Sequence, residues 1–353
     1  MQKLPMRNKS RSCCAKCFLG TVLYIFILLL LLFLIIFVVV PVVFKYSTGI
    51  QQNLIFPTWI IQAENYTNVE AFGIKGVKNF YLNLENEDNV TLGIWHILPF
   101  EILSDVIDNN DYNYDGILEN ANYNILLYLH GNGGDRTSSL ELYEILRRYF
   151  QIFAVDYRGY ADSSKAKMGE SGIVADIVQL YKWLRTKSKS KIFFWGHSLG
   201  TGVASHAIAN LKRDNISSHG VVLEAPFTSV TDVMKTHPVV KVFSFLPWFS
   251  ITIIDPIIGN DLNFNVKAYI LDVDCPVMIL HAKDDDIISY NFATEVYNTA
   301  VNSRNYTYQG NVTYHLFDVL NYGHMYLYKA PELSSYVGDF IAECDNFERQ
   351  IHN

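Results

Sequence analysis

Cysteine and clustered basic charge are both scarce in this sequence of 353 residues. Of the five cysteines, only Cys275 and Cys344 lie beyond the first 17 residues. Two cysteines are too few for a disulfide framework, so the fold must depend on a hydrophobic core, and half of the residues are hydrophobic. The net charge of -7 and the lack of a basic tract in the main body argue against nucleic acid as a partner.

Internal repeats and low-complexity linkers are also absent, so we expect one large domain with an appendage. Near the amino end, Cys13, Cys14 and Cys17 lie on a basic flank of the kind where reversible palmitoylation occurs, and reduced thiols are the alternative. The sequence leaves open whether Cys275 and Cys344 are bridged.

One apolar run, residues 18–44, contains no charged residue. At about 1.5 Å per residue it makes a helix of roughly 40 Å, longer than the hydrocarbon core of about 30 Å requires. A cleaved signal peptide is the alternative, but its apolar region runs for only about 7 to 15 residues. We therefore expect an uncleaved transmembrane anchor.

The charges that flank this run predict its orientation. The bases that precede it, with no acid among them, are Lys3, Arg7, Lys9, Arg11 and Lys16. Only Lys45 follows soon after, so residues 1–17 form a cytosolic tail and the rest of a single-pass type II protein faces a lumen or the cell exterior. That side carries five N-glycosylation sequons, whose occupancy the sequence leaves open: Asn65, Asn89, Asn215, Asn305 and Asn311.

Beyond the anchor, residues 45–75 read as an extended stalk, and residues 76–353 alternate strand patterns with amphipathic helix patterns. The expected strands are Val77–Leu84, Val90–Leu98, Ile125–Leu129, Ile152–Val155, Ile192–Trp195, Val221–Leu223, Val277–Leu280 and Val312–Phe317. The expected helices are Leu140–Phe150, Ile173–Leu184, Val203–Leu211 and Phe292–Ala300. This order predicts an α/β fold with a mostly parallel sheet and helices on both faces.

The segment Gly196-His197-Ser198-Leu199-Gly200 lies between an apolar strand and a helix pattern. Glycines two residues before and two after a serine permit the sharp, strained turn that exposes the hydroxyl of a nucleophile elbow. A plain helix N-cap is the alternative reading of Ser198. Because a neutral hydroxyl is a poor nucleophile, the elbow needs a histidine to take its proton and an acid to orient that histidine.

In proteins with such an elbow the acid and then the histidine follow the serine, each after a strand. Three aspartates, Asp284, Asp285 and Asp286, follow the strand that ends at Leu280, and we expect Asp285 to be the acid. We expect the first to complete the exit of the strand and the third to open the next turn or cap the helix. A solvated acidic loop is the alternative, and Glu224 is the other candidate acid.

Three histidines follow the acid. His315 falls inside the last strand and reads as a core residue, while His352 lies at the frayed terminus. His324 follows Gly323 on the loop after the last strand, so we expect it to be the base.

Backbone amides must also stabilise the developing oxyanion. We expect these from Leu199, after the nucleophile, and from Asn132 in the turn His130-Gly131-Asn132-Gly133-Gly134. His130 and Asp135 also have the spacing of an acyltransferase pair, which we interpret as a coincidence of the glycine-rich turn.

These motifs together resemble the α/β-hydrolase-fold serine hydrolases, and among them the membrane-anchored lysophosphatidylserine lipases that also hydrolyse monoacylglycerols. The resemblance covers residues 76–341 and rests on Leu129-His130-Gly131-Asn132, Asp156-Tyr157-Arg158-Gly159, Gly196-His197-Ser198-Leu199-Gly200, Glu224-Ala225-Pro226-Phe227-Thr228, Leu280-His281-Ala282-Lys283-Asp284-Asp285 and Tyr326-Leu327-Tyr328-Lys329-Ala330-Pro331-Glu332. It implies an eight-stranded sheet, Ser198 as nucleophile, Asp285 as acid, His324 as base, and an endoplasmic reticulum location with a lumenal catalytic domain. It implies no metal or organic cofactor.

A long apolar insertion at about residues 229–270 falls between the sixth and seventh strands, where such enzymes carry a cap. Pro247 and Pro256 interrupt it, so it is too short for a second membrane span. Most of it is expected to pack as the core of the cap, and part to remain uncovered as an acyl-chain channel or as a face that dips into the bilayer.

The insertion around Asp111 and the segment Asn321-Tyr322-Gly323-His324 depart from the family pattern. The first has half the spacing of a calcium loop, but Asn122 stands where the bidentate glutamate belongs, so we favour an acidic surface loop. An acyl-protein thioesterase or peptidase with the same triad, or a non-catalytic membrane tether, are the alternative functions. The head group, the acyl chain and the oligomeric state are left open.

Overall fold

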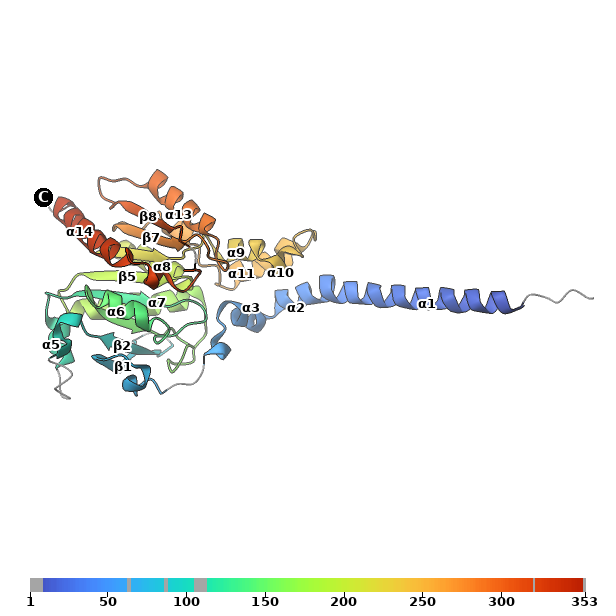
Figure 1. The fold of residues 1–353 in the computed structure, drawn as a ribbon, viewed down its shortest axis with the longest axis horizontal. Helices are drawn as coiled ribbons and strands as arrows, with labels where there is room; N and C mark the ends of the chain where they lie inside the picture. The colour runs from blue at the N-terminus through green and yellow to red at the C-terminus, as the bar shows by residue number, and fades with distance from the viewer. Residues whose placement is uncertain (1–8, 62–64, 86–87, 105–112, 320, 352–353) are drawn as a thin grey trace, which may run out of the picture.

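The structure is a computed structural model that describes residues 9–61, 65–85, 88–104, 113–319 and 321–351. Figure 1 shows a layered α/β body from which one long amino-terminal helix projects. The body contains one eight-stranded sheet in the order β1-β2-β4-β3-β5-β6-β7-β8. The α/β-hydrolase fold expected from the sequence is confirmed by this architecture.

The strands follow the predicted pattern closely. They are β1 (Val77–Asn83), β2 (Thr91–Ile97), β3 (Asn124–Leu129), β4 (Phe150–Val155), β5 (Ile192–His197), β6 (Gly220–Glu224), β7 (Val277–Ala282) and β8 (Val312–Phe317). The pairs β1–β2 and β2–β4 are antiparallel, and every other pair is parallel. The strands β3, β5 and β7 are buried along nearly their whole length and are mostly apolar, because helices cover both faces of the sheet.

Two hydrophobic clusters fill the space between the sheet and its helices. On one face the sheet packs against α7 (Glu170–Lys187), α8 (Leu199–Arg213) and α13 (Tyr290–Ser303). On the other face it packs against α6 (Leu140–Leu146) and α14 (Leu333–Ile351). The helix expected to continue to Phe150 ends at Leu146, because Phe150 already begins β4.

The amino-terminal helix consists of α1 (Lys9–Leu34), a π-helical turn (Ile35–Val39) and α2 (Val40–Tyr46). Among the described residues, Lys16–Tyr46 is the helix long and apolar enough to cross a membrane, and it projects from the body (Figure 1). We refer to this helix as the anchor. Cys17 at its start is exposed and unbridged.

The extended stalk expected for residues 45–75 is not what this segment forms. Ser47 caps a helix, α3 (Thr48–Ile55), whose Gln51 and Ile55 are buried against the body, followed by 3-10 turns at Thr58–Ile60 and Val69–Phe72. Gln51 donates to the Phe44 carbonyl over 2.6 Å and accepts from the Asn260 side chain over 2.6 Å. The segment is compact because these bonds bind the end of the anchor to the cap.

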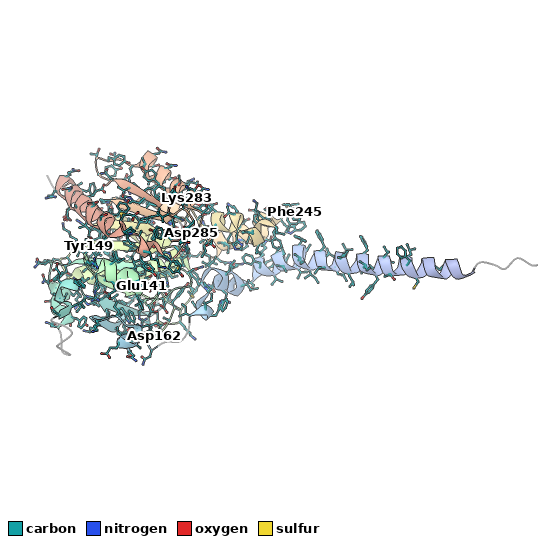
Figure 2. The ribbon with its side chains drawn as sticks, in the orientation of Figure 1. Glu141, Tyr149, Asp162, Phe245, Lys283 and Asp285 are labelled. Atoms are coloured by element: carbon teal, nitrogen blue, oxygen red, sulfur yellow. The ribbon has the colours of Figure 1, made fainter. Side chains whose placement is uncertain are left out.

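The cap between β6 and β7 comprises α9 (Val230–Thr236), α10 (Pro238–Lys241), a π-helical turn (Ser250–Ile254), α11 (Asp255–Gly259) and α12 (Val266–Tyr269). The Trp248 indole N–H donates to the Phe37 carbonyl of the anchor over 3.0 Å. Phe37 also contacts the rings of Phe243 and Phe245, each with a centroid separation of 5.6 Å. The cap therefore rests on the end of the anchor helix, with Phe245 at its tip (Figure 2).

Two further expectations concern metal and sulfur. The Asp111 insertion lies largely outside the described residues, and directly after it Asn113 caps a short helix, α5 (Tyr114–Glu119), that contains Gly116. Within the described ranges no group of three or more His, Cys, Asp or Glu residues is arranged to hold a metal. Cys275 and Cys344 are buried and unbridged.

Candidate active site

Ser198 occupies the sharp turn between β5 and α8. Its backbone has φ 51° and ψ -116°, which a non-glycine residue rarely adopts and which is the strained geometry of an elbow. A Cβ atom on Gly196 would collide with the Gly200 carbonyl, and one on Gly200 with the Leu129 carbonyl. Only glycine fits at both positions, which explains their spacing around Ser198.

The three consecutive aspartates after β7 have three different surroundings. Asp284 accepts the backbone amides of Asn321 (2.6 Å) and Gly323 (3.0 Å) and so fastens the loop that leads to His324. Asp285 accepts from His324 Nδ1 over 2.7 Å. Asp286 is exposed and does not cap the next helix, because Ser289 takes that position.

The Asp285 side chain is fully buried yet well satisfied. One oxygen accepts the amides of Ile287 (2.9 Å) and Ile288 (2.8 Å), and the other lies 3.2 Å from His281 Nε2. Burial alone raises the pKa of this carboxyl, but hydrogen bonds from His281 and His324 outweigh burial and hold the pKa below its ordinary value. Asp285 is therefore a carboxylate at neutral pH.

His324 lies next to the elbow. The neighbour of the serine, His197, donates from Nε2 to the His324 carbonyl over 2.9 Å, and the centroids of the two rings are 4.9 Å apart. Within the described residues, Ser198 Oγ and His324 Nε2 form no direct hydrogen bond. Hydrogen bonds between a nucleophile and its base are often long or poorly aligned until a substrate binds. His315 instead stacks on Tyr336 at 3.8 Å, as a packing residue, and His352 lies outside the described residues.

The two expected oxyanion donors both border the elbow. Neither the Leu199 amide nor the Asn132 amide donates a hydrogen bond to any described residue, and both residues line the same pocket as Ser198. A Cβ on Gly131 would lie 3.3 Å from the Ser198 Cβ, which shows how closely this turn approaches the serine. The Tyr160 hydroxyl donates to the Asn132 carbonyl over 2.8 Å and supports the turn.

The His130 and Asp135 pair does not form a catalytic unit. His130 Nδ1 donates to the Gly131 carbonyl over 2.7 Å, and burial lowers the pKa of His130 to about 4. Asp135 accepts from the Tyr66 hydroxyl (2.8 Å) and from the Thr137 amide (2.8 Å). Both residues form hydrogen bonds with backbone groups of the turn that contains Asn132 or of the residues that follow it, and neither lines the pocket.

Glu224, the other candidate acid, serves a different purpose. Its carboxyl accepts from the Trp195 indole over 2.7 Å, and its backbone carbonyl accepts from the Ser198 amide over 2.9 Å. Burial raises the pKa of Glu224 to about 7. The histidine partner at this site is therefore Asp285 rather than Glu224.

An apolar pocket of about 320 Å³ opens above Ser198. Its floor is Ser198, Leu199 and Asn132, and no Asp, Glu, Lys or Arg among the described residues lines it. Its walls come from the cap and, unexpectedly, from α3 through Leu54 and Ile55. The signal that sequence reasoning missed is the helix start at Ser47, followed by apolar residues three, seven and eight positions later.

Comparisons with known proteins agree with this geometry. The family described as "alpha/beta hydrolase fold" matches residues 124–237. The lysophosphatidylserine lipase ABHD12 of Rattus norvegicus is 31% identical over 324 residues, which cover 88% of this chain and 78% of that protein. Protein ABHD12B of Homo sapiens is 32% identical over 269 residues, which cover 75% of this chain and 72% of that protein.

Solved structures share the fold at lower identity. An esterase from Pyrococcus furiosus is 20% identical with a TM-score of 0.54, over 81% of this chain and 95% of that one. An alpha-beta hydrolase from Vibrio vulnificus is 15% identical with a TM-score of 0.57, over 87% of this chain and 94% of that one. At these identities the similarity concerns the fold alone.

Proposed function

The chain belongs to the family of the lysophosphatidylserine lipase ABHD12, within the α/β-hydrolase fold, and on that premise we propose that it cleaves acyl esters of lysophospholipids or monoacylglycerols through Ser198, Asp285 and His324. As a member of this family it is a hydrolase of the lipase and esterase class, and its relatives support lysophospholipid hydrolysis. The proposal that Ser198, Asp285 and His324 carry out this cleavage depends mainly on one observation. The Asp285–His324 pair, 2.7 Å apart, lies beside a strained serine at the floor of an apolar pocket.

In the proposed reaction, His324 Nε2 removes the proton from Ser198 Oγ as the oxygen attacks the ester carbonyl. Asp285 holds the imidazole through Nδ1 and stabilises its charged form. The Leu199 and Asn132 amides receive the oxyanion, and each such donor contributes roughly a hundred- to a thousandfold in rate.

When the tetrahedral adduct collapses, the imidazolium returns its proton to the departing alcohol, and the acyl group remains on Ser198. A water molecule then gives a proton to His324 and attacks the acyl carbonyl. His324 passes that proton to Ser198 Oγ as the fatty acid leaves, which restores both residues. The apolar lining suits the acyl chain of the substrate rather than its charged head group.

We further propose a single-pass type II orientation in the endoplasmic reticulum membrane, with a lumenal catalytic domain. The apolar helix Lys16–Tyr46 and the basic residues before it support this orientation. All five sequon asparagines, which lie after the apolar helix in the chain, are exposed, as glycan attachment requires. Because the anchor would keep the enzyme on a bilayer, a lipid dissolved in that bilayer is the natural substrate class.

The decisive experiment replaces the proposed nucleophile. Ser198→Ala in the full-length protein, reconstituted in vesicles, is expected to abolish hydrolysis of lysophosphatidylserine and monoacylglycerol and to block labelling by a fluorophosphonate probe. The control Ser303→Ala, at an exposed site on the end of α13, should behave as the wild type. Undiminished turnover by Ser198→Ala would refute the proposal, and turnover of acyl-peptide but not of lipid would favour the thioesterase or peptidase alternative.

A further inference from the structure

The apolar pocket above Ser198 has two walls that come from distant parts of the chain. One wall is the cap, where Val239 and Val240 of α10 lie at the rim and Phe227 and Met234 lie deeper. The other wall is α3, which contributes Leu54 at the rim and Ile55 below it. The second wall begins only two residues after the apolar helix ends at Tyr46.

Helix α3 is held firmly in this position. The fully buried Gln51 bonds both to the Phe44 carbonyl at the end of the anchor and to Asn260 of the cap. The next residue, Gln52, donates to the Met168 carbonyl over 2.7 Å. These bonds fix α3 to the anchor, the cap and the body, and so hold Leu54 and Ile55, one turn after Gln51, in the wall of the pocket.

We infer that the helix after the anchor is part of the acyl-chain binding site, with Leu54 and Ile55 facing Val239 and Val240 across one fatty acyl chain. This inference rests on the proposed function and deepens it. The anchor segment then selects substrates by chain length, in addition to holding the enzyme at the membrane. An alkyl chain is the occupant that fits, because the described lining is mostly aliphatic and includes no Lys or Arg to pair with a phosphate or carboxylate group.

The rim of the pocket also indicates the route by which the fatty acyl chain of the substrate enters. Leu54 and Val239 are about half or more exposed, at 49% and 66%, and so are the neighbouring Val242 and Phe245 at 52% and 65%. Phe245 contacts Phe37, and Trp248 bonds to the Phe37 carbonyl, so this apolar rim continues onto the surface of the membrane helix. A fatty acyl chain that leaves the bilayer along the anchor can therefore follow this apolar rim to Ser198 without being exposed to water.

Because Leu54 and Val239 are exposed at the rim, each can be enlarged without disturbing the core. We suggest Leu54→Trp, Val239→Trp and the double variant, assayed as full-length protein in vesicles with octanoyl and oleoyl lysophosphatidylserine. Each methylene that tryptophan keeps out of the pocket is expected to cost about fourfold in kcat/KM. The ratio of oleoyl to octanoyl kcat/KM should therefore fall about sixteenfold in each single variant that excludes two methylenes.

The double variant should show less than the product of the two single effects, because both side chains would contact the same acyl chain. Ile258→Trp and Ile50→Trp are matched controls, since both residues are exposed, on α11 of the cap and on α3, but do not line the pocket, and they should leave the ratio unchanged. Equal fluorophosphonate labelling of all variants shows that the catalytic residues are intact.

An unchanged ratio in both single variants, or an equal shift in the controls, would overturn the inference. Failure of the proposed function gives a different result, namely a wild-type protein that neither hydrolyses acyl esters nor reacts with the probe at Ser198.

Discussion

His197 donates its Nε2–H to the backbone carbonyl of His324 over 2.9 Å, so the residue before the elbow serine holds the loop of the proposed base. Burial, and to a lesser extent the charge of His324, lowers the pKa of His197 to about 3. The imidazole is therefore neutral across physiological pH, and the hydrogen bond persists there. This contact links the elbow to a loop 127 residues further along the chain.

His197→Phe keeps an aromatic ring but removes the N–H donor. We expect kcat to fall about tenfold, the equivalent of one hydrogen bond of roughly 1.4 kcal/mol, with little change in KM, because His197 positions His324 and does not line the pocket. Steady-state kinetics and thermal unfolding, measured together, separate this effect from loss of fold. A wild-type kcat in a folded variant would contradict the positioning role.

Asp285→Asn tests the choice among the three aspartates. An amide cannot stabilise the imidazolium, so kcat is expected to fall by about 10⁴-fold. Asp286→Asn is the matched control and should be close to wild type, because Asp286 is exposed. Asp284→Asn should fall between the two, since Asp284 only fastens the loop before His324. If Asp286→Asn were the most damaged of the three, our assignment of the acid would be wrong.

Glu224→Gln should change how stability depends on pH. The folded pKa of Glu224 is about 7, above its ordinary 4.5, so the unfolded chain loses this proton first as pH rises. Between pH 4.5 and 7 the wild type is expected to lose about 3 kcal/mol of stability through this group, a loss that glutamine does not share.

Denaturant unfolding at acidic and alkaline pH measures this difference. Glu224→Gln should match the wild type near pH 4 and be the more stable of the two near pH 8. A difference between the two proteins that stays constant with pH would show that Glu224 has the same pKa in the folded and the unfolded state.

Gln51→Leu removes the link between anchor, α3 and cap. The amide of Asn260 and the carbonyl of Phe44 then lose a buried partner, so we expect the free energy of unfolding to fall by about 1–3 kcal/mol. Residues 45–61 should also become more susceptible to limited proteolysis. Asn53→Leu, at an exposed position of the same helix, should change neither quantity. Equal proteolysis of the two variants would argue against the link.

The sheet and the elbow could be predicted from the sequence because local patterns determine them. Each strand has its own apolar run, and the glycines around Ser198 reflect a steric limit within five residues. By contrast, the burial of α3 depends on Asn260, which lies 209 residues beyond Gln51, and no local pattern reports such a contact. The distinct environments of Asp284 and Asp285 likewise become visible only when the loop at residues 321–324 is in place. The roles of Ser198, Asp285 and His324 in catalysis stay predictions.

The π-helical turn at Ile35–Val39 presents the Phe37 carbonyl to Trp248, while Gln51 binds the Phe44 carbonyl about two turns further along the helix. The carbonyls of Phe37 and Phe44 therefore hold the last turns of the anchor to the catalytic body through two hydrogen bonds, and these bonds restrict rotation of the anchor against the body. In a bilayer, any tilt of the anchor is therefore transmitted to the mouth of the pocket. Because helix tilt adjusts to membrane thickness, the thickness of the host membrane would set the angle at which this protein meets a lipid.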